Sequence, residues 1–250
     1  MAAMTLYLVV AAGAVVAGFV QGLSGFAFGL VAMSFWVWVL EPQLAAVLTV
    51  FGGLLGQLIA AFSVRRGFRL RQLLPFVLGG LAGIPIGVGL LPLIDTDTFK
   101  LVLGTFLLIW CPAMLLIQRI PKISVGGRIA DAVAGLGGGV MGGLGGFTGV
   151  VPTLWCLLRG FARDEQRAII QNFNLAMLAV IMLTYLGTGL VTRDTLPYLA
   201  IVAPAMLIPT FLGTRLYLGI SDQRFRQIVL GLLTLSGLTM LGSALGRMLG

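Results

Sequence analysis

A glycine-rich element inside an apolar segment occurs twice in this chain and limits what the chain can fold into. Residues Gln21–Phe26 (QGLSGF) are followed 121 positions later by Gly142–Phe147 (GGLGGF), and no charged residue lies nearby. Lipid offers no hydrogen bonds to free backbone groups, so a broken helix persists at membrane depth only where protein or a watery cavity satisfies them. Paired breaks in two halves of a chain therefore indicate the binding site of a transporter.

The composition is that of a membrane protein. Hydrophobic residues make up 59% of the chain, charged residues make up 10%, and the mean hydropathy is +1.08. These values exclude a soluble globule, and the alternating pattern of a transmembrane β-barrel is absent. We expect a polytopic helical membrane protein. The apolar stretch 1–16 has no basic region and no cleavage site, so we expect it to be retained structure and not a signal peptide.

Eight apolar segments follow one another along the chain, and the two that contain the glycine elements are unusually long. Segments 5–40 and 130–158 are 36 and 29 residues long, against about 20 for one crossing. The second would give roughly 43 Å of helix, whereas two full crossings need about 60 Å. We therefore predict that each is a re-entrant hairpin of two half-helices. The other six segments are predicted single spans: 44–63, 73–94, 101–117, 168–191, 196–218 and 228–245.

The distribution of basic residues supports the hairpins. The net charge is +8, but the basic residues fall in short connections between apolar segments, which argues against a nucleic-acid partner. With two hairpins, 12 of the 16 Lys and Arg residues lie on one face, compared with nine if both long segments cross once. The positive-inside rule makes that face cytoplasmic and puts both termini on the opposite side. The four clusters are Arg65, Arg66, Arg69 and Arg71; Arg119, Lys122 and Arg128; Arg159, Arg163 and Arg167; and Arg224 and Arg226.

Similarity between the two halves extends beyond the glycine element. With two hairpins, each half contains one hairpin and three spans. Because three is an odd number of crossings, the second half is inverted in the membrane relative to the first. We predict an all-α membrane fold of two inverted repeats, residues 1–121 and 122–250. The ordered matches are Gly18 with Gly139, Leu74-Pro75 with Leu196-Pro197, Ile84-Pro85 and Gly89 with Ile208-Pro209 and Gly213, and Lys100 approximately with Arg226.

The paired elements Gly18–Phe26 and Gly139–Phe147, in a basic and duplicated chain of 250 residues, resemble the sulfite exporter family of TauE/SafE type. The resemblance covers nearly the whole chain. It implies a secondary transporter that exports small sulfur-containing anions, such as sulfite, sulfoacetate and other organosulfonates, across the bacterial cytoplasmic (inner) membrane. The first element carries Gln21 and Ser24 where the second carries Gly142 and Gly145, so the two sides of the site are expected to differ chemically.

The chemistry of the breaks favours an anion independently of this resemblance. A helix that starts after a break presents unpaired N–H groups and the positive end of its dipole, and both attract anions. These N–H groups are predicted to belong to residues 24–27 and 145–148. Polar residues on the following spans are predicted to face the same midplane site, with Asn172 equivalent to Thr49. The predicted substrate-binding residues are Gln21, Gly22, Ser24, Gly25, Phe26, Thr49, Gly143, Gly145, Gly146, Phe147, Thr148, Asn172 and Asn174; Gln57, Thr184 and Tyr185 are weaker candidates.

Structural roles are alternatives for each of these residues. The glycines can serve close helix packing, Ser24 and Thr148 can bond to local carbonyls, and the asparagines can join helices. Phe26 and Phe147 are expected to be packing wedges, with a gate as the alternative. Trp36, Trp38, Trp110 and Trp155 are expected at interfaces or in packing.

Other functions are less well supported. The chain has no His, and its eight acids lie at segment ends, so the sequence shows no proton relay and predicts no metal or cofactor. An enzyme would need a nucleophile with a base, or paired carboxylates, and neither is visible. An anion channel, an importer of another small oxyanion and a non-transporting membrane subunit remain alternatives. The expected partners are the substrate and the bilayer, and a homo-oligomer is compatible with the sequence.

Overall fold

The computed structural model describes residues 2–24, 27–63, 67, 69–117, 122–123, 126–215 and 222–249. All elements in these ranges are helical, as predicted. The α-helices are α1 (Ala2–Ser24), α2 (Phe28–Trp36), α3 (Pro42–Ser63), α4 (Leu70–Leu90), α5 (Thr96–Leu116), α6 (Gly127–Gly145), α7 (Val150–Arg159), α8 (Arg163–Gly187), α9 (Leu196–Arg215) and α10 (Asp222–Leu249). Within the described residues, seven helices are long and apolar enough to cross a membrane: α1, α3, α4, α5, α8, α9 and α10.

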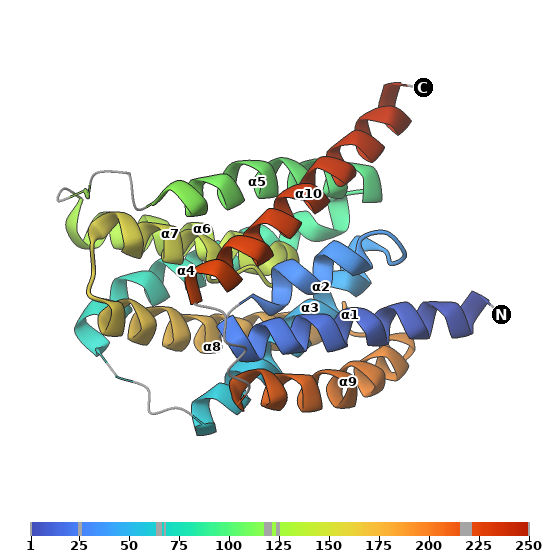
Figure 1. Ribbon diagram of the computed structural model, residues 1–250, viewed down its shortest axis with the longest axis horizontal. Helices are drawn as coiled ribbons and strands as arrows, with labels where there is room; N and C mark the ends of the chain where they lie inside the picture. The colour runs from blue at the N-terminus through green and yellow to red at the C-terminus, as the bar shows by residue number, and fades with distance from the viewer. Residues whose placement is uncertain are drawn as a thin grey trace.

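Helices break at both glycine elements, since α1 ends at Ser24 and α6 ends at Gly145. In each half the short helix after the break turns back along the longer one (Figure 1). Trp36 at the end of α2 accordingly donates to the Val10 carbonyl of α1 at 3.3 Å. The arms are unequal, unlike the predicted half-helices, because α1 has 23 residues and α2 only nine. Whether either hairpin is re-entrant in a bilayer stays a prediction.

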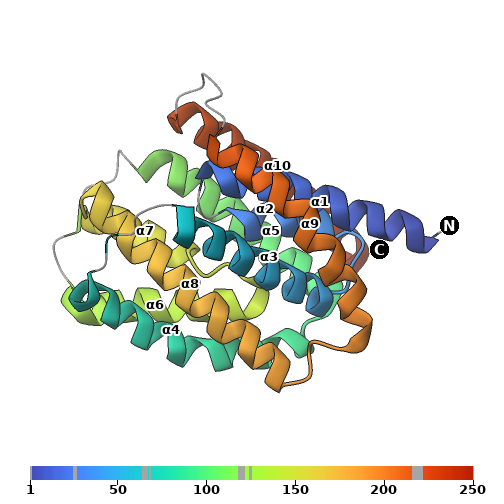
Figure 2. The same cartoon turned by 90° about the horizontal axis from the view of Figure 1, so that it is seen from below.

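The helix contacts recur between the two halves. Helix α1 packs along α9, α6 packs along α4, and α5 lies beside α10 (Figures 1 and 2). A Cβ atom on Gly22 would overlap the Thr210 carbonyl and Gly213, and one on Gly143 would overlap the Ile84 carbonyl and the backbone of Gly87. A two-fold relation between the halves would produce this recurrence, and the repeat boundaries stay a prediction.

These crossings change two sequence assignments. Gly22 and Gly143 serve close helix packing and do not line a cavity, because the backbone of a neighbouring helix fills the space where each Cβ atom would lie. Judged by contacts, the residue of the first half that is equivalent to Gly213 is Gly87. Gly213 packs against Gly22, and Gly87 packs against Gly143. The sequence comparison matched Gly89 instead, but a Cβ atom on Gly89 would meet nothing within 4 Å.

Replacing Gly139 by alanine is expected to destabilise the protein at the α4–α6 crossing. The added Cβ would overlap the backbone of Gly80, which cannot move aside as a flexible side chain would. Overpacking of this kind costs about 1–3 kcal/mol. Gly231→Ala is the matched control, because Gly231 lies in α10 with open space around its Cβ position. Thermal unfolding in detergent should show a lower midpoint for Gly139→Ala only, and equal midpoints would contradict this account of the crossing.

The two ends of the bundle differ in charge. Both termini lie at one end, here called the terminal end, whereas α4, α6, α8 and α10 begin at the other, here called the basic end (Figure 1). An Arg69–Glu165 ion pair at 2.5 Å joins α4 and α8 at the basic end, and an Arg247–Asp97 pair at 3.3 Å joins α10 and α5 at the terminal end. Of the predicted clusters, Arg65, Arg66 and Arg119 lie outside the described residues. The basic end holds Arg69, Arg71, Lys122, Arg128, Arg159, Arg163, Arg167, Arg224 and Arg226.

Candidate functional site

The two glycine breaks meet between α3, α5 and α8 and enclose a small cavity. Its volume is about 20 Å³, which is room for about one water molecule. Helix α2, which follows the first break, contacts the second break, because a Cβ atom on Gly29 would lie 3.1 Å from the carbonyl oxygen of Gly146. A polyatomic anion therefore fits only if the breaks separate. The amide and hydroxyl side chains that line the cavity are those of Gln21, Gln57, Thr148 and Asn174, and the other lining residues include Leu30, Trp110, Gly146 and Phe147.

Side chains satisfy the N–H groups that begin α2. The Phe28 N–H donates to Oε1 of Gln21 at 3.0 Å, and the Ala27 N–H donates to Oγ of Ser24 at 3.3 Å. The Ser24 hydroxyl also donates to the Val20 carbonyl at 2.7 Å. The prediction of an unpaired N–H at Ala27 is therefore wrong, and Gly25 and Phe26 lie outside the described residues. Gln21 is a buried helix cap at the cavity, whereas Ser24 lines a different space.

At the second break, the backbone N–H groups of Gly146 and Phe147 hydrogen-bond to carbonyls of α6, the helix before the break. Gly146 has a left-handed backbone with φ of +77°. Its N–H donates to the Gly142 carbonyl at 2.7 Å, and the Phe147 N–H donates to the Met141 carbonyl at 3.3 Å. This is the hydrogen-bond pattern of a glycine C-cap. The N–H groups of Gly145, Gly146 and Phe147 are therefore not free for an anion, contrary to the prediction, because the preceding helix uses them.

Side-chain groups supply the polarity of the second break. The Thr148 hydroxyl donates to Oδ1 of Asn174 at 2.9 Å, and both residues are buried. The amide group of Asn174 packs against Gly149, where an added Cβ atom would lie 2.8 Å from Nδ2 and 2.9 Å from Oδ1. The predicted pair Thr148 and Asn174 is thus brought together at the cavity.

Asn172 does not face the cavity, so that prediction is wrong. Its NH₂ group donates to the Gly67 carbonyl at 3.0 Å and to the Ala168 carbonyl at 2.8 Å. The reason is helical geometry, since residues two apart on a helix differ by about 200° in direction. Asn172 and Asn174 therefore cannot both point inward from α8.

Four further candidates have structural roles. Thr49 is fully buried between the breaks, with its methyl group 3.3 Å and 3.0 Å from the Cβ positions of Gly29 and Gly146. It does not line the cavity, and its hydroxyl has no hydrogen-bond partner in the described part of the chain. Gly145 packs against the Phe147 ring. The weaker candidate Tyr185 donates to the Gly143 carbonyl at 2.7 Å, and Thr184 donates to the Val180 carbonyl at 2.9 Å.

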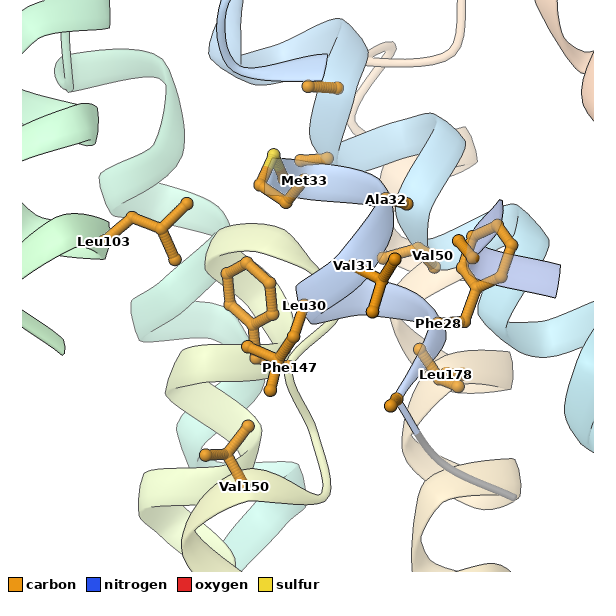
Figure 3. Packing of buried hydrophobic residues seen from close by; sticks show 14 of the residues in the cluster. Phe28, Leu30, Val31, Ala32, Met33, Val50, Leu103, Phe147, Val150 and Leu178 are labelled. Atoms are coloured by element: carbon orange, nitrogen blue, oxygen red, sulfur yellow. The ribbon is translucent and has the colours of Figure 1, made fainter. Parts of the chain in front are cut away.

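An apolar plug closes the terminal side of the small cavity. Phe147 is buried, and toward the terminal end it lies near Met33 and Leu103 (Figure 3). Leu103 belongs to the half of α5 that lies toward the terminal end, so the plug separates the cavity from that end. This position agrees with the gate alternative for Phe147 as well as with the wedge.

A larger space, here called the vestibule, lies on the basic side of the small cavity. Its volume is about 380 Å³, and α1, α2, α5, α7, α8 and α10 contribute to its walls. Leu30 and Trp110 border both spaces, and the Trp110 indole N–H donates to the Val150 carbonyl at 3.2 Å. These two side chains therefore stand between the vestibule and the small cavity.

Three arginines line the vestibule: Arg163, Arg167 and Arg226. Arg163 and Arg167 are exposed, whereas Arg226 is half-buried and donates to the Met114 carbonyl at 2.6 Å. The same wall holds Thr153, which is buried and whose hydroxyl has no hydrogen-bond partner among the described residues. Sequence reasoning assigned these arginines to orientation only and Trp110 to packing. One feature of the sequence could have pointed to the vestibule: the match of Arg226 to Lys100 distinguishes Arg226 from the other arginines between the apolar segments.

A family model described as "Sulfite exporter TauE/SafE" matches residues 10–240. The chain belongs to the sulfite exporter TauE/SafE family. The match covers both glycine breaks, the small cavity and the vestibule, so it confirms the resemblance drawn from the paired elements. TauE/SafE membership, together with the apolar helices, identifies an integral membrane protein and supports sulfur-anion transport over enzymatic activity. Comparisons with curated proteins and with solved structures return no match.

Proposed function

We propose that this TauE/SafE protein is a secondary transporter that exports small sulfur-containing anions, such as sulfite or sulfoacetate, by alternating access around the two glycine breaks. The observation that carries the proposal is the vestibule lined by Arg163, Arg167 and Arg226, which ends at a polar cavity between the breaks. Clefts lined by one sign of charge raise the local concentration of oppositely charged ligands. The arginines therefore favour an anion.

The site holds the anion with neutral donors. Past Leu30 and Trp110, the anion meets the side-chain amides of Gln21, Gln57 and Asn174. Each amide has an NH₂ group that can donate to an oxyanion. Donors without charge bind an anion less tightly than arginines do, which favours release on the far side.

The volumes of the two spaces suggest which state of the transport cycle this is. The vestibule of about 380 Å³ admits a small organosulfonate, but the cavity of about 20 Å³ does not. The Phe147 plug closes the opposite side. We assign the structure to a state accessible from the basic end, in which the site between the breaks is collapsed. Binding then requires Leu30 and Trp110 to move, and release requires the plug to open.

The direction of transport follows from orientation. With the basic end in the cytoplasm, as the positive-inside rule predicts, the vestibule faces the cytoplasm. An inside-negative potential drives a monovalent anion outward by about 2.3 kcal/mol per 100 mV. A uniporter is then sufficient for export, and no coupling ion is required.

Uptake of radiolabelled sulfite and sulfoacetate into proteoliposomes under a positive-inside potential tests this function. We expect saturable uptake that organosulfonates inhibit and chloride does not. Taurine and sulfate added as competitors define the class of anion. Uptake of another oxyanion, without sulfite or sulfoacetate uptake by inserted protein, would contradict the sulfur-anion assignment. Flux that does not saturate would favour a channel.

Replacing both Arg163 and Arg167 by glutamine is expected to raise KM for uptake from the basic end by roughly 3–10-fold, since exposed charges contribute about 0.2–1 kcal/mol each. The maximal rate should change little, because neither residue touches the small cavity. Wild-type KM should rise with ionic strength. Arg71→Gln is the control, because Arg71 is exposed at the same end but does not line the vestibule. An equal effect of Arg71→Gln would show that surface charge in general is responsible.

A further inference from the structure

Lys100 is a buried cation near the terminal end, on the opposite side of the breaks from the vestibule. It is the fifth residue of α5 and only 2% exposed. Its ammonium group lies 4.9 Å from the ring centroid of Trp38. The neighbouring carboxylate of Asp97 is paired with Arg247 at 3.3 Å, and no carboxylate of a described residue forms an ion pair with Lys100. Burying an ammonium group that forms no ion pair is costly, and attraction to the Trp38 ring and to the Asp97 carboxylate offsets that cost only in part.

Arg226 occupies the equivalent position in the other half. It lies near the start of α10, as Lys100 lies near the start of α5. The two helices lie side by side and run in opposite directions, so the two cations point to opposite ends of one helix pair (Figure 1). Arg226 lines the vestibule at the basic end. Lys100 holds the corresponding place at the terminal end.

One face of α5 connects Lys100 with the vestibule. Lys100, Leu103, Leu107, Trp110 and Met114 are all buried and follow one another at spacings of three and four residues, which places them along one side of the helix. Trp110 and Met114 line the vestibule, Leu103 belongs to the plug, and Lys100 follows beyond it. The distance along α5 from Trp110 to Lys100 is about 15 Å. The face therefore passes from the vestibule, past the breaks, to the buried cation.

We propose that Lys100 binds the transported anion at the terminal end, in a second vestibule that opens when the Phe147 plug separates. Lys100 then has the role there that Arg226 has at the basic end, and Trp38 holds its ammonium group while that side is closed. The ligand is the small oxyanion or organosulfonate that passes the breaks. This proposal rests on the transport function proposed above.

Lys100→Gln tests the proposal in proteoliposomes of known orientation, with KM measured for uptake from each face. We expect KM from the terminal end to rise roughly 10-fold, as for a lost hydrogen bond to a charged group, and KM from the basic end to change less than about twofold. Arg226→Gln should give the mirror image, and Lys100→Arg should stay close to wild type. Arg193→Gln is the control for charge at the same end, because Arg193 is exposed and follows α8 there. Equal KM changes at both faces, or no change at either, would overturn the assignment of Lys100.

A measurement without substrate separates this proposal from the transport function. Leu103→Cys, in a background where Cys111 and Cys156 are alanine, is treated from the terminal end with an anionic and a neutral thiosulfonate reagent. We expect both reagents to label Cys at 103, and Lys100→Gln to slow only the anionic reagent, by about fivefold or more. If sulfur-anion flux is absent but this labelling pattern is seen, the sulfur-anion assignment is wrong and an anion site at Lys100 is supported. Absence of labelling, or equal slowing of both reagents, would reject the Lys100 site itself.

Discussion

Replacing Asn174 by aspartate is expected to lower the initial rate of sulfur-anion uptake by about 100-fold or more. The substitution keeps the size of the side chain and its acceptor for the Thr148 hydroxyl, which lies at 2.9 Å, but puts a carboxylate on the wall of the small cavity. Two like charges about 5 Å apart repel by about 3 kcal/mol at an effective dielectric constant of about 20. The rate should be measured in proteoliposomes at about pH 8, where an aspartate is normally ionised, and at a substrate concentration below the wild-type KM.

Asn172→Asp is the matched control. It adds the same charge to the same helix two residues away, where the side chain contacts the Gly67 and Ala168 carbonyls and not the cavity. We expect its uptake rate to stay within about threefold of wild type. Both variants should be inserted and monodisperse in detergent. Equal loss in the two variants, or none in Asn174→Asp, would remove Asn174 from the substrate site.

Replacing Gly146 by leucine is expected to abolish transport while leaving membrane insertion intact. Gly146 has a φ of +77°, a conformation that costs other residues about 1–2 kcal/mol. An added Cβ would also lie 3.0 Å from the Thr49 methyl group and 3.3 Å from the Val50 nitrogen. The leucine side chain would thus press on α3 at Thr49, whose methyl group also lies 3.3 Å from the Cβ position of Gly29 in α2, and would keep the two breaks apart. Uptake by reconstituted protein and its thermal midpoint in detergent are the measurements.

Gly189→Leu separates backbone strain from the effect at the site. Gly189 has a φ of +76°, nearly that of Gly146, but open space surrounds its Cβ position. The two variants should therefore share the cost of the left-handed backbone, and Gly189→Leu should retain transport. Wild-type flux in Gly146→Leu would show that the second break is not part of the pathway.

The sequence was sufficient to predict the positions of the breaks. Glycine at the end of a helix allows a left-handed cap, and α6 ends at Gly145 with Gly146 as its cap. The N–H groups of Ala27, Gly146 and Phe147 were assigned wrongly, because the sequence does not show whether such a group hydrogen-bonds to the helix before the break or stays free at the start of the next helix. The N–H groups of Gly146 and Phe147 bond to carbonyls of α6, and the Phe28 N–H donates to the side chain of Gln21, seven residues earlier.

Long-range packing decides the rest of the site. Asn174 faces the cavity and Asn172 does not, and only the rotation of α8 against its neighbours distinguishes them. Trp110 and Arg226 come from α5 and α10, and their contribution to the vestibule depends on how these helices converge with α8. A charge near a membrane span is typical of orientation signals, so composition alone could not assign Arg226 to the pathway.

Counterflow distinguishes a carrier from a channel and shows whether Asn174 belongs to the binding site. Proteoliposomes loaded with unlabelled sulfoacetate are diluted into a trace of labelled sulfoacetate, and labelled anion inside is followed over time. We expect a transient accumulation above equilibrium for wild type and for Asn172→Asp, and none for Asn174→Asp. Flux without accumulation in wild type would identify a channel. Absence of any sulfoacetate or sulfite exchange by folded, inserted protein would contradict a sulfur-anion carrier with its site at the glycine breaks.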